Sequence, residues 1–304
     1  MQPEDKIPFV FLTSHAFSGS TLLGFLMDMH PEVATVGELT GPARHIDLSR
    51  YPCSCGRLFQ ADVFWQEVSA VLNEYGVPYS LNQYFGTRFE LSSHRARQRL
   101  LAGSLRNTFI ENWRDRVIFT LRPSFRQRLV EQATRNELFA RAILAVTGKS
   151  VFLDTSKNPM RIRYLQLSPH IELYVIHLVR DVRGVVTSIM SRHPDTAVRQ
   201  ATRSWIAREK NIQRHLKTVP PSRQIHIRYE ALVTDTLPVL NRILTFIGVD
   251  PLAELGNYRE VEHHILGNKM RKQSSAEIKL DERWRTVLSE KQLQIIANMV
   301  GVSE

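Results

Sequence analysis

The chain has 304 residues, of which 43% are hydrophobic and 23% are charged, and these values exclude disordered and fibrous proteins. Its formal net charge of +10 indicates an anionic partner or a basic surface, but the basic residues are dispersed and no zinc-finger spacing or RNA-binding signature occurs, so nucleic acid is not expected as the partner. No apolar run reaches the ~20 residues of a membrane span and the acidic N-terminus does not look like a signal peptide, so we expect a cytoplasmic protein.

The first readable unit is a strand, a small-residue loop and a helix. Residues 7–13 form a continuous apolar, β-prone run, which predicts a strand buried on both faces. From Thr21 apolar residues recur at helical spacing until His30-Pro31. Four residues of the loop are small enough for their backbone N–H groups to surround an anion at the positive end of the helix dipole: Ser18, Gly19, Ser20 and Thr21. This unit predicts a phosphate-binding loop.

The loop is not that of an ATPase or GTPase, because the pattern GxxxxGK[ST] requires a lysine that is missing here. The run from Phe17 to Leu23, FSGSTLL, instead resembles the 5′-phosphosulfate loop of sulfotransferases that use 3′-phosphoadenosine-5′-phosphosulfate (PAPS), which commonly reads R-S-G-[ST]-[ST]-L-L after a strand. The resemblance implies that the loop, Phe17 included, holds the donor. Phe17 replaces the basic residue of the family, and His15 is the nearest substitute for its charge.

Glu38 follows the next predicted strand, residues 33–36. Catalytic groups in open α/β sheets lie just outside the carboxyl ends of strands, so this position suits a functional carboxylate. The run HP-x-V followed by an acidic residue resembles protein-tyrosine sulfotransferases, and that resemblance implies that Glu38 is the base acting on the acceptor hydroxyl. The alternative is an ordinary solvated loop carboxylate.

Residues 40–123 are interpreted as a largely helical, acceptor-side insertion within a single domain that spans residues 1–304. The pattern predicts helices at 62–75 and 91–113. The Arg-rich stretch 94–99 reads as a solvated helix face, with a basic patch for the acceptor as the alternative.

The two cysteines of the chain, Cys53 and Cys55, lie in the run YPCSCGR. Two thiols cannot complete a structural zinc site by themselves. His263 and His264 are candidate metal ligands, but adjacent histidines point to different sides and no third ligand is obvious. We therefore expect a structural loop and no metal.

Lys157 lies after a third buried run. The apolar pattern of residues 125–146 with Gly148 beyond predicts a long helix with a glycine cap, and residues 150–153 predict a strand that ends in DTSKNP. In the sulfotransferases, a lysine of a K-x-P-like element reaches the bridging oxygen between phosphate and sulfonate. Lys157 matches this lysine, although a surface lysine is the alternative.

Further elements of the resemblance follow strands 171–178 and 224–228. The family binds the 3′-phosphate with an arginine just after a strand and a serine eight positions later, which Arg180 and Ser188 match. The YE-x-L element places Tyr229 near the adenine, with a buried structural tyrosine as the alternative. A basic C-terminal loop that closes the nucleotide site in many members corresponds to Arg271 and Lys272.

Alternating buried strands and helices predict an α/β protein, and the resemblance implies a three-layer fold like that of P-loop NTPases, with a central parallel sheet of about five strands and helical insertions. The function it implies is sulfonyl transfer from PAPS to a hydroxyl or amine of a carbohydrate, small molecule or protein, without a metal. Two alternatives stay open, a kinase-like phosphotransferase that uses a nucleotide and a non-catalytic nucleotide-binding module. The pattern does not indicate the acceptor or the oligomeric state.

Overall fold

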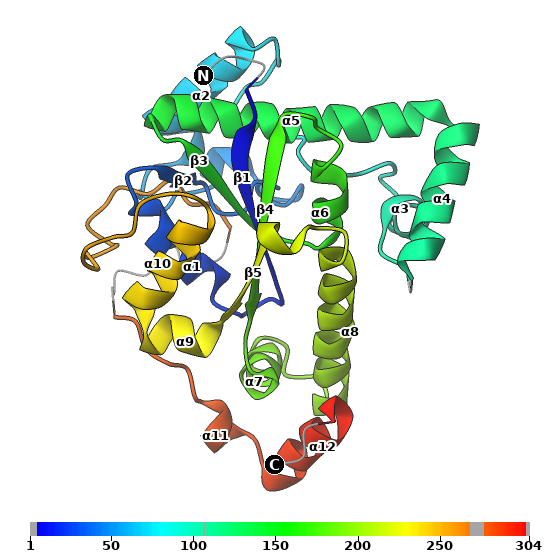
Figure 1. Ribbon diagram of the computed structural model, residues 1–304, viewed down its shortest axis with the longest axis vertical. Coiled ribbons are helices and arrows are strands. Elements are labelled where there is room, and N and C mark those ends of the chain that lie inside the picture. The colour runs from blue at the N-terminus through cyan, green and yellow to red at the C-terminus, as the bar shows by residue number, and fades with distance from the viewer. Residues whose placement is uncertain (1–4, 106, 268–276, 302–304) are drawn as a thin grey trace.

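The computed structural model describes residues 5–105, 107–267 and 277–301. Five strands and their covering helices follow one another along the chain (Figure 1). The elements are β1 Ile7–Ser14, α1 Ser20–Asp28, β2 Val33–Thr35, η1 Leu48–Arg50, η2 Phe59–Ala61, α2 Val63–Glu74, α3 Arg95–Ala102, α4 Thr108–Leu121, α5 Pro123–Thr147, β3 Val151–Lys157, α6 Met160–Leu165, β4 Ile171–Val179, α7 Val182–Arg192, α8 Val198–Leu216, η3 Pro221–Arg223, β5 Gln224–Arg228, α9 Tyr229–Thr234, α10 Thr236–Phe246, α11 Trp284–Val287 and α12 Glu290–Val300.

The sheet is parallel throughout, with the strand order β2-β3-β1-β4-β5. The carboxyl ends of all five strands therefore meet at one edge, as the sequence predicts. β3 is longer than expected, because the polar residues 154–157 continue the strand instead of leaving it. Its last residue, Lys157, pairs with Thr13 of β1 across an irregularity in the ladder.

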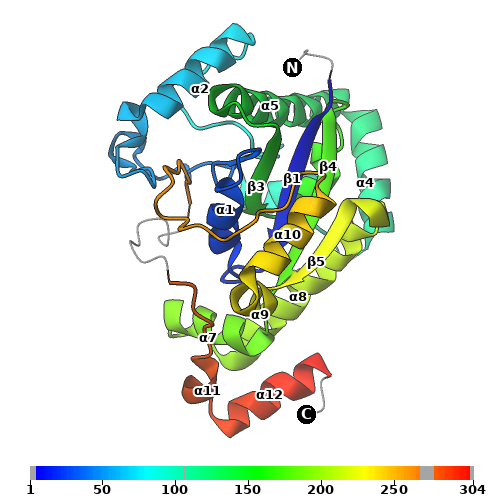
Figure 2. The same cartoon turned by 60° about the vertical axis from the view of Figure 1, so that its left-hand side comes forward.

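Side chains alternate between two apolar layers, one on each face of the sheet. Phe9 and Phe11 of β1 pack in a cluster with residues of α2, α5, α6 and α8, whereas Val10 and Leu12 pack with residues of α1, α9 and α10. Figure 2 shows α10 in front of the sheet and α8 behind it. The predicted three-layer α/β fold is confirmed.

The region 40–123 contains η1, η2 and the helices α2, α3 and α4. α2 agrees with the expected helix at 62–75. The single helix expected at 91–113 is wrong, because α3 ends at Ala102, Gly103 is extended and Asn107 starts α4 by accepting a hydrogen bond from Phe109 N. Across the described ranges, no helix is both long and apolar enough to cross a bilayer.

Candidate active site

The loop between β1 and α1 has the backbone of an anion-binding turn. Phe17 and Gly19 both adopt left-handed conformations, with φ of 66° and 84°, and Gly19 caps α1. Such turns point successive N–H groups to the same side. Ser18 is fully buried, and its Oγ finds no hydrogen-bond partner in the described part of the chain, like Ser14 Oγ. A buried hydroxyl without a partner is costly, so these atoms fit a loop that is completed by an oxygen-rich ligand.

Tyr229 and Arg180 lie against this loop. A Cβ on Gly19 would come within 2.6 Å of Tyr229 Cδ2, so the ring packs directly on the loop backbone. The guanidinium of Arg180 lies 4.6 Å from the centre of the same ring and donates to Phe17 O at 2.8 Å. Three segments far apart in the sequence thus meet at the start of α1.

Replacing Gly19 by Ala should destabilise the chain for two separable reasons. A left-handed alanine costs ~1–2 kcal/mol, and overpacking against the Tyr229 ring costs ~1–3 kcal/mol more. Gly76→Ala is the matched control, because Gly76 has φ of 75° but no atom within 4 Å of the added Cβ. Urea unfolding should show a larger loss of unfolding free energy for Gly19→Ala. Equal losses in the two variants would mean that the tyrosine contact is unimportant.

His15 does not carry the charge for which the sequence nominates it. It is buried, its Nδ1 is 2.9 Å from Ala16 O, and burial lowers its pKa, with the nearby Arg208 lowering it further. The imidazole is therefore mainly neutral at neutral pH. Arg208 lies half-buried on α8 and makes no hydrogen bond or ion pair with any described residue. Burial lowers the pKa of its guanidinium. Sequence reasoning missed this cation because no motif surrounds it.

Arg180 follows β4 and is buried. Besides Phe17 it contacts Asp281, with 2.9 Å from Nη2 to the carboxylate. Hydrogen bonds from Arg283 and Arg180 outweigh burial and lower the pKa of Asp281. The acid thus stays ionised beside Arg180, where it would compete with a bound phosphate. Ser188 lies on α7, where its Oγ donates to Gly184 O at 2.9 Å.

The side chain of Arg180 packs against α7, the helix that carries Ser188. The Arg180 side chain packs over Gly184, since a Cβ there would lie 2.8 Å from Nε, and Gly184 is one turn before Ser188. The remaining members of the predicted 3′-phosphate site, Arg271 and Lys272, lie outside the described residues.

Glu38 and Lys157 form an ion pair, with 2.5 Å between Lys157 Nζ and Glu38 Oε1. Both side chains are partly exposed, at 30% and 18%. Lys157 also has a left-handed backbone, with φ of 65°, and among the described residues only it and Phe17 do so without being glycine. Strained backbones of this kind concentrate at functional sites. Both strained positions therefore fall where the sequence predicts a site.

Asp154 holds the two partners of this pair in place. Its Oδ1 accepts from Leu39 N at 3.0 Å and from Ser156 N at 2.9 Å, the residues next to Glu38 and Lys157. Its Oδ2 accepts two hydrogen bonds from the buried Arg161. One buried carboxylate thus links the loop after β2 to the end of β3. The sequence did not indicate this role, because nothing in the pattern shows where Asp154 points.

Comparison with known proteins decides the family. A family model described as "Sulfotransferase family" matches residues 72–254, more than half of the chain. The chain belongs to the sulfotransferase family. The matched range includes Lys157, Arg180, Ser188 and Tyr229. The loop 17–21 and Glu38 precede it.

Solved structures of two sulfotransferase domains are similar to the chain in fold. The sulfotransferase domain from the Synechococcus PCC 7002 olefin synthase is 19% identical with a TM-score of 0.52, covering 100% of this chain and 99% of its own. The sulfotransferase domain from the curacin biosynthetic pathway is 18% identical with a TM-score of 0.51, covering 98% and 99%. No curated protein matches the chain.

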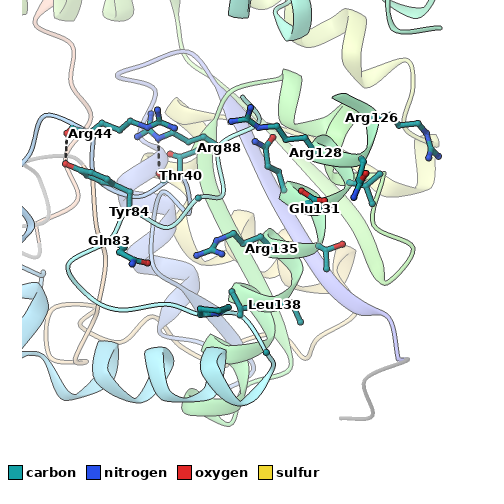
Figure 3. A pocket seen from close by; sticks show the side chains of 18 of the residues that line it. Thr40, Arg44, Gln83, Tyr84, Arg88, Arg126, Arg128, Glu131, Arg135 and Leu138 are labelled. Atoms are coloured by element: carbon teal, nitrogen blue, oxygen red, sulfur yellow. Dashed lines mark hydrogen bonds between the residues drawn. The ribbon is translucent and has the colours of Figure 1, made fainter. Parts of the chain in front are cut away.

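A pocket of about 1260 Å³ on this sulfotransferase lies between the region 40–123 and α5 and is strongly basic. Figure 3 shows Thr40, Glu131 and the five arginines that line the pocket. The arginines are Arg44, Arg88, Arg126, Arg128 and Arg135. Thr40 is two residues after Glu38. It also lines a smaller pocket of about 330 Å³ that includes Asn158, the neighbour of Lys157.

Proposed function

We propose that this sulfotransferase uses PAPS as its donor and transfers the sulfonyl group to a hydroxyl or amine. The observation that carries the proposal is the Glu38–Lys157 ion pair at the carboxyl edge of the sheet. A carboxylate and an ammonium in contact can serve as proton acceptor and as stabiliser of a leaving oxygen. A kinase-like role is disfavoured by the missing lysine of the loop.

In this proposal the donor lies across the start of α1. Residues Ser18 to Thr21 hold the 5′-phosphosulfate with their backbone N–H groups, and Arg208 supplies the charge that Phe17 cannot. Arg180 and Ser188 hold the 3′-phosphate, and Tyr229 lies on the adenine side. Arg271 and Lys272 are proposed, on the sequence resemblance, to complete the 3′-phosphate site.

Lys157 then donates to the bridging oxygen as the sulfur–oxygen bond of the donor breaks, and Glu38 takes the proton of the acceptor as its oxygen or nitrogen bonds to sulfur. The transition state spreads charge along a line, so positioning and electrostatics supply most of the rate enhancement. The ion pair must open before both residues can act, because in an in-line transfer the leaving oxygen of the donor and the attacking atom of the acceptor lie on opposite sides of the sulfur.

The arginine-lined pocket is proposed to hold the acceptor, which fits the interpretation of residues 40–123 as the acceptor side. Five arginines and one glutamate line the pocket, and one of the arginines, Arg44, pairs with the nearby Glu90. The remaining excess of positive charge favours an acceptor with a carboxylate, sulfate or phosphate group. Thr40 lines both this pocket and the smaller pocket that includes Asn158. The two pockets together extend from the arginines toward Glu38 and Lys157.

The test is transfer of labelled sulfonate from PAPS to a panel of matched acceptors, each supplied with and without an anionic group. We expect transfer to anionic carbohydrates or small molecules in preference to their neutral counterparts. Transfer to neutral acceptors alone would refute the assignment of the pocket. Donor binding without transfer across the panel would instead favour the non-catalytic module.

Arg180→Ala should weaken the binding of adenosine 3′,5′-bisphosphate, the desulfated donor, roughly 10- to 150-fold, because a charge-assisted hydrogen bond contributes ~1.5–3 kcal/mol. Asp281→Asn should tighten binding, since it removes the carboxylate that competes for Arg180. Calorimetric titration measures both changes, with Arg199→Ala on the exposed surface of α8 as control. Unchanged affinity in Arg180→Ala would rule out the assignment.

A further inference from the structure

Four potential metal ligands from three segments of the chain meet at the edge of the region 40–123. Cys53 and Cys55 come from the loop between η1 and η2, Asp62 caps α2, and His264 comes from the segment that returns to β2 after α10. Their ligand atoms all lie within 4.8 Å of one another. We call these four residues the Cys–Asp–His cluster. It lies outside the set of residues that form the proposed donor site.

The distances within the cluster suit a tetrahedral ion. His264 Nδ1 lies 2.9 Å from Asp62 Oδ2 and 3.8 Å from Cys53 Sγ, and Cys55 Sγ lies 3.1 Å from Asp62 Oδ2. Bonds of ~2.3 Å to sulfur and ~2.0–2.2 Å to nitrogen and oxygen give tetrahedron edges of about 3.3–3.8 Å. Two of these separations are shorter than the tetrahedral edges, the third equals the longest edge, and no pair of ligand atoms is more than 4.8 Å apart. Side-chain shifts of about 1 Å or less would therefore complete the coordination.

Neighbouring groups fix the orientation of the ligands. Asp62 Oδ1 accepts from Phe64 N at 3.2 Å and lies 3.9 Å from Arg57 Nη1, which leaves Oδ2 facing the cluster. The Phe64 ring stacks on the His264 imidazole at 4.0 Å and 8°. Outer contacts of this kind orient metal ligands in proteins.

The loop that carries the thiols is also built to hold them together. Cys53 N donates to Arg57 O at 2.8 Å, and Pro52 pairs with Leu58 in an isolated bridge. The turn passes through Gly56, whose φ of 91° is a conformation that favours glycine. The CSCG run therefore presents two sulfur atoms on one side of a closed loop.

Burial makes a cation at this place favourable. Asp62 is fully buried and Cys53 is 2% exposed. The Asp62 carboxylate accepts from Phe64 N and contacts Cys55 Sγ and His264 Nδ1, and the mostly solvent-exposed Arg57 lies 3.9 Å away. A cation bound among these ligands would compensate the charge of the buried carboxylate directly. Thiolate sulfur, imidazole and a carboxylate together form a donor set that selects Zn²⁺ over Mg²⁺ or Ca²⁺.

We propose that the Cys–Asp–His cluster binds one Zn²⁺ through Cys53 Sγ, Cys55 Sγ, Asp62 Oδ2 and His264 Nδ1. Four protein ligands leave no open position, so the ion is structural, and its binding releases the two thiol protons. It joins the cysteine loop to the segment 264–267. In that segment Leu266 N donates to Val36 O at 2.8 Å, and a Cβ on Gly267 would lie 3.3 Å from the Glu38 carboxylate. The zinc thereby fixes the chain beside Glu38.

This proposal replaces the expectation of no metal. The adjacent histidines do diverge, as expected: His263 Nδ1 contacts Asp28 and His264 faces the cysteines. Sequence reasoning found no further ligand because Asp62 reads as an ordinary helix cap.

The first experiment measures metal content by mass spectrometry in the full chain, purified without any histidine tag. We expect about one zinc per chain in the wild type and a loss of at least about tenfold in Cys53→Ser and His264→Gln. His94→Gln, at an exposed histidine outside the cluster, is the matched control and should keep its zinc. Zinc that stays in both cluster variants, or its absence from wild-type chain supplied with zinc, would overturn the proposal.

The second experiment needs no variant, so it holds even if the cluster variants fail to fold. Co²⁺ is titrated into chelator-treated wild type. A near-ultraviolet thiolate-to-cobalt band with visible tetrahedral bands is expected at one equivalent, and the chain has only these two cysteines to produce it. A Co²⁺ spectrum without the thiolate band, or an intact mass that reveals a Cys53–Cys55 disulfide, would refute zinc ligation.

Discussion

Glu38→Gln should lower turnover ~10²–10⁴-fold, the range associated with loss of a general base. The amide keeps the shape of the side chain but cannot accept the acceptor's proton. Because Glu38 lies outside the proposed nucleotide contacts, affinity for adenosine 3′,5′-bisphosphate should stay within about twofold. Initial rates with saturating PAPS and the best acceptor of the panel measure the effect.

Glu67→Gln is the control for this variant, because Glu67 is an exposed glutamate on α2. It should leave turnover unchanged. A near-normal rate in Glu38→Gln would exclude this carboxylate as the base and leave His15 and His45 to be tested. His15 Nδ1 lies 2.9 Å from Ala16 O, so Nε2 would be its accepting atom.

Lys157→Met should lower turnover ~10²–10³-fold, the usual effect of removing one donor that stabilises developing charge. Methionine keeps the unbranched apolar stem of lysine and lacks its terminal ammonium, so the ion pair with Glu38 is lost but the packing is largely retained. The reduction should appear in kcat and in kcat/KM for PAPS to a similar extent, which distinguishes a transition-state contact from ground-state binding.

Lys210→Met, at an exposed position on α8, serves as the matched control. The Glu38→Gln/Lys157→Met double variant adds a sharper test. If the two side chains act in the same step, the effects should combine less than additively in free energy. A rise in KM for PAPS with unchanged kcat would contradict the catalytic role of Lys157.

Much of the fold could be predicted because buried parallel strands are read directly from apolar runs. Residues 7–13, 171–178 and 224–228 correspond closely to β1, β4 and β5. The parallel order also implied that Glu38 and Lys157 lie at one edge of the sheet. Their direct contact was not predictable, because it depends on Asp154 and on the left-handed backbone of Lys157.

Contacts between distant segments account for what sequence reasoning missed. Arg208 on α8, Asp281 near the C-terminus and Asp62 before α2 stand in no recognisable motif, and each acquires its role from a neighbour more than 100 residues away. The helix expected at 91–113 failed for a local reason, since one glycine and one capping asparagine outweighed the apolar pattern.

Thermal unfolding with adenosine 3′,5′-bisphosphate tests the donor site most directly, with ATP and Mg²⁺ as the control ligand. Saturation at ~100 times Kd should add ~2.7 kcal/mol to the unfolding free energy, which raises Tm by a few degrees in a chain of this size. We expect a shift with the bisphosphate that is reduced in Arg180→Ala. A shift with ATP alone would support the phosphotransferase alternative, and no shift with either nucleotide would contradict the proposed donor site.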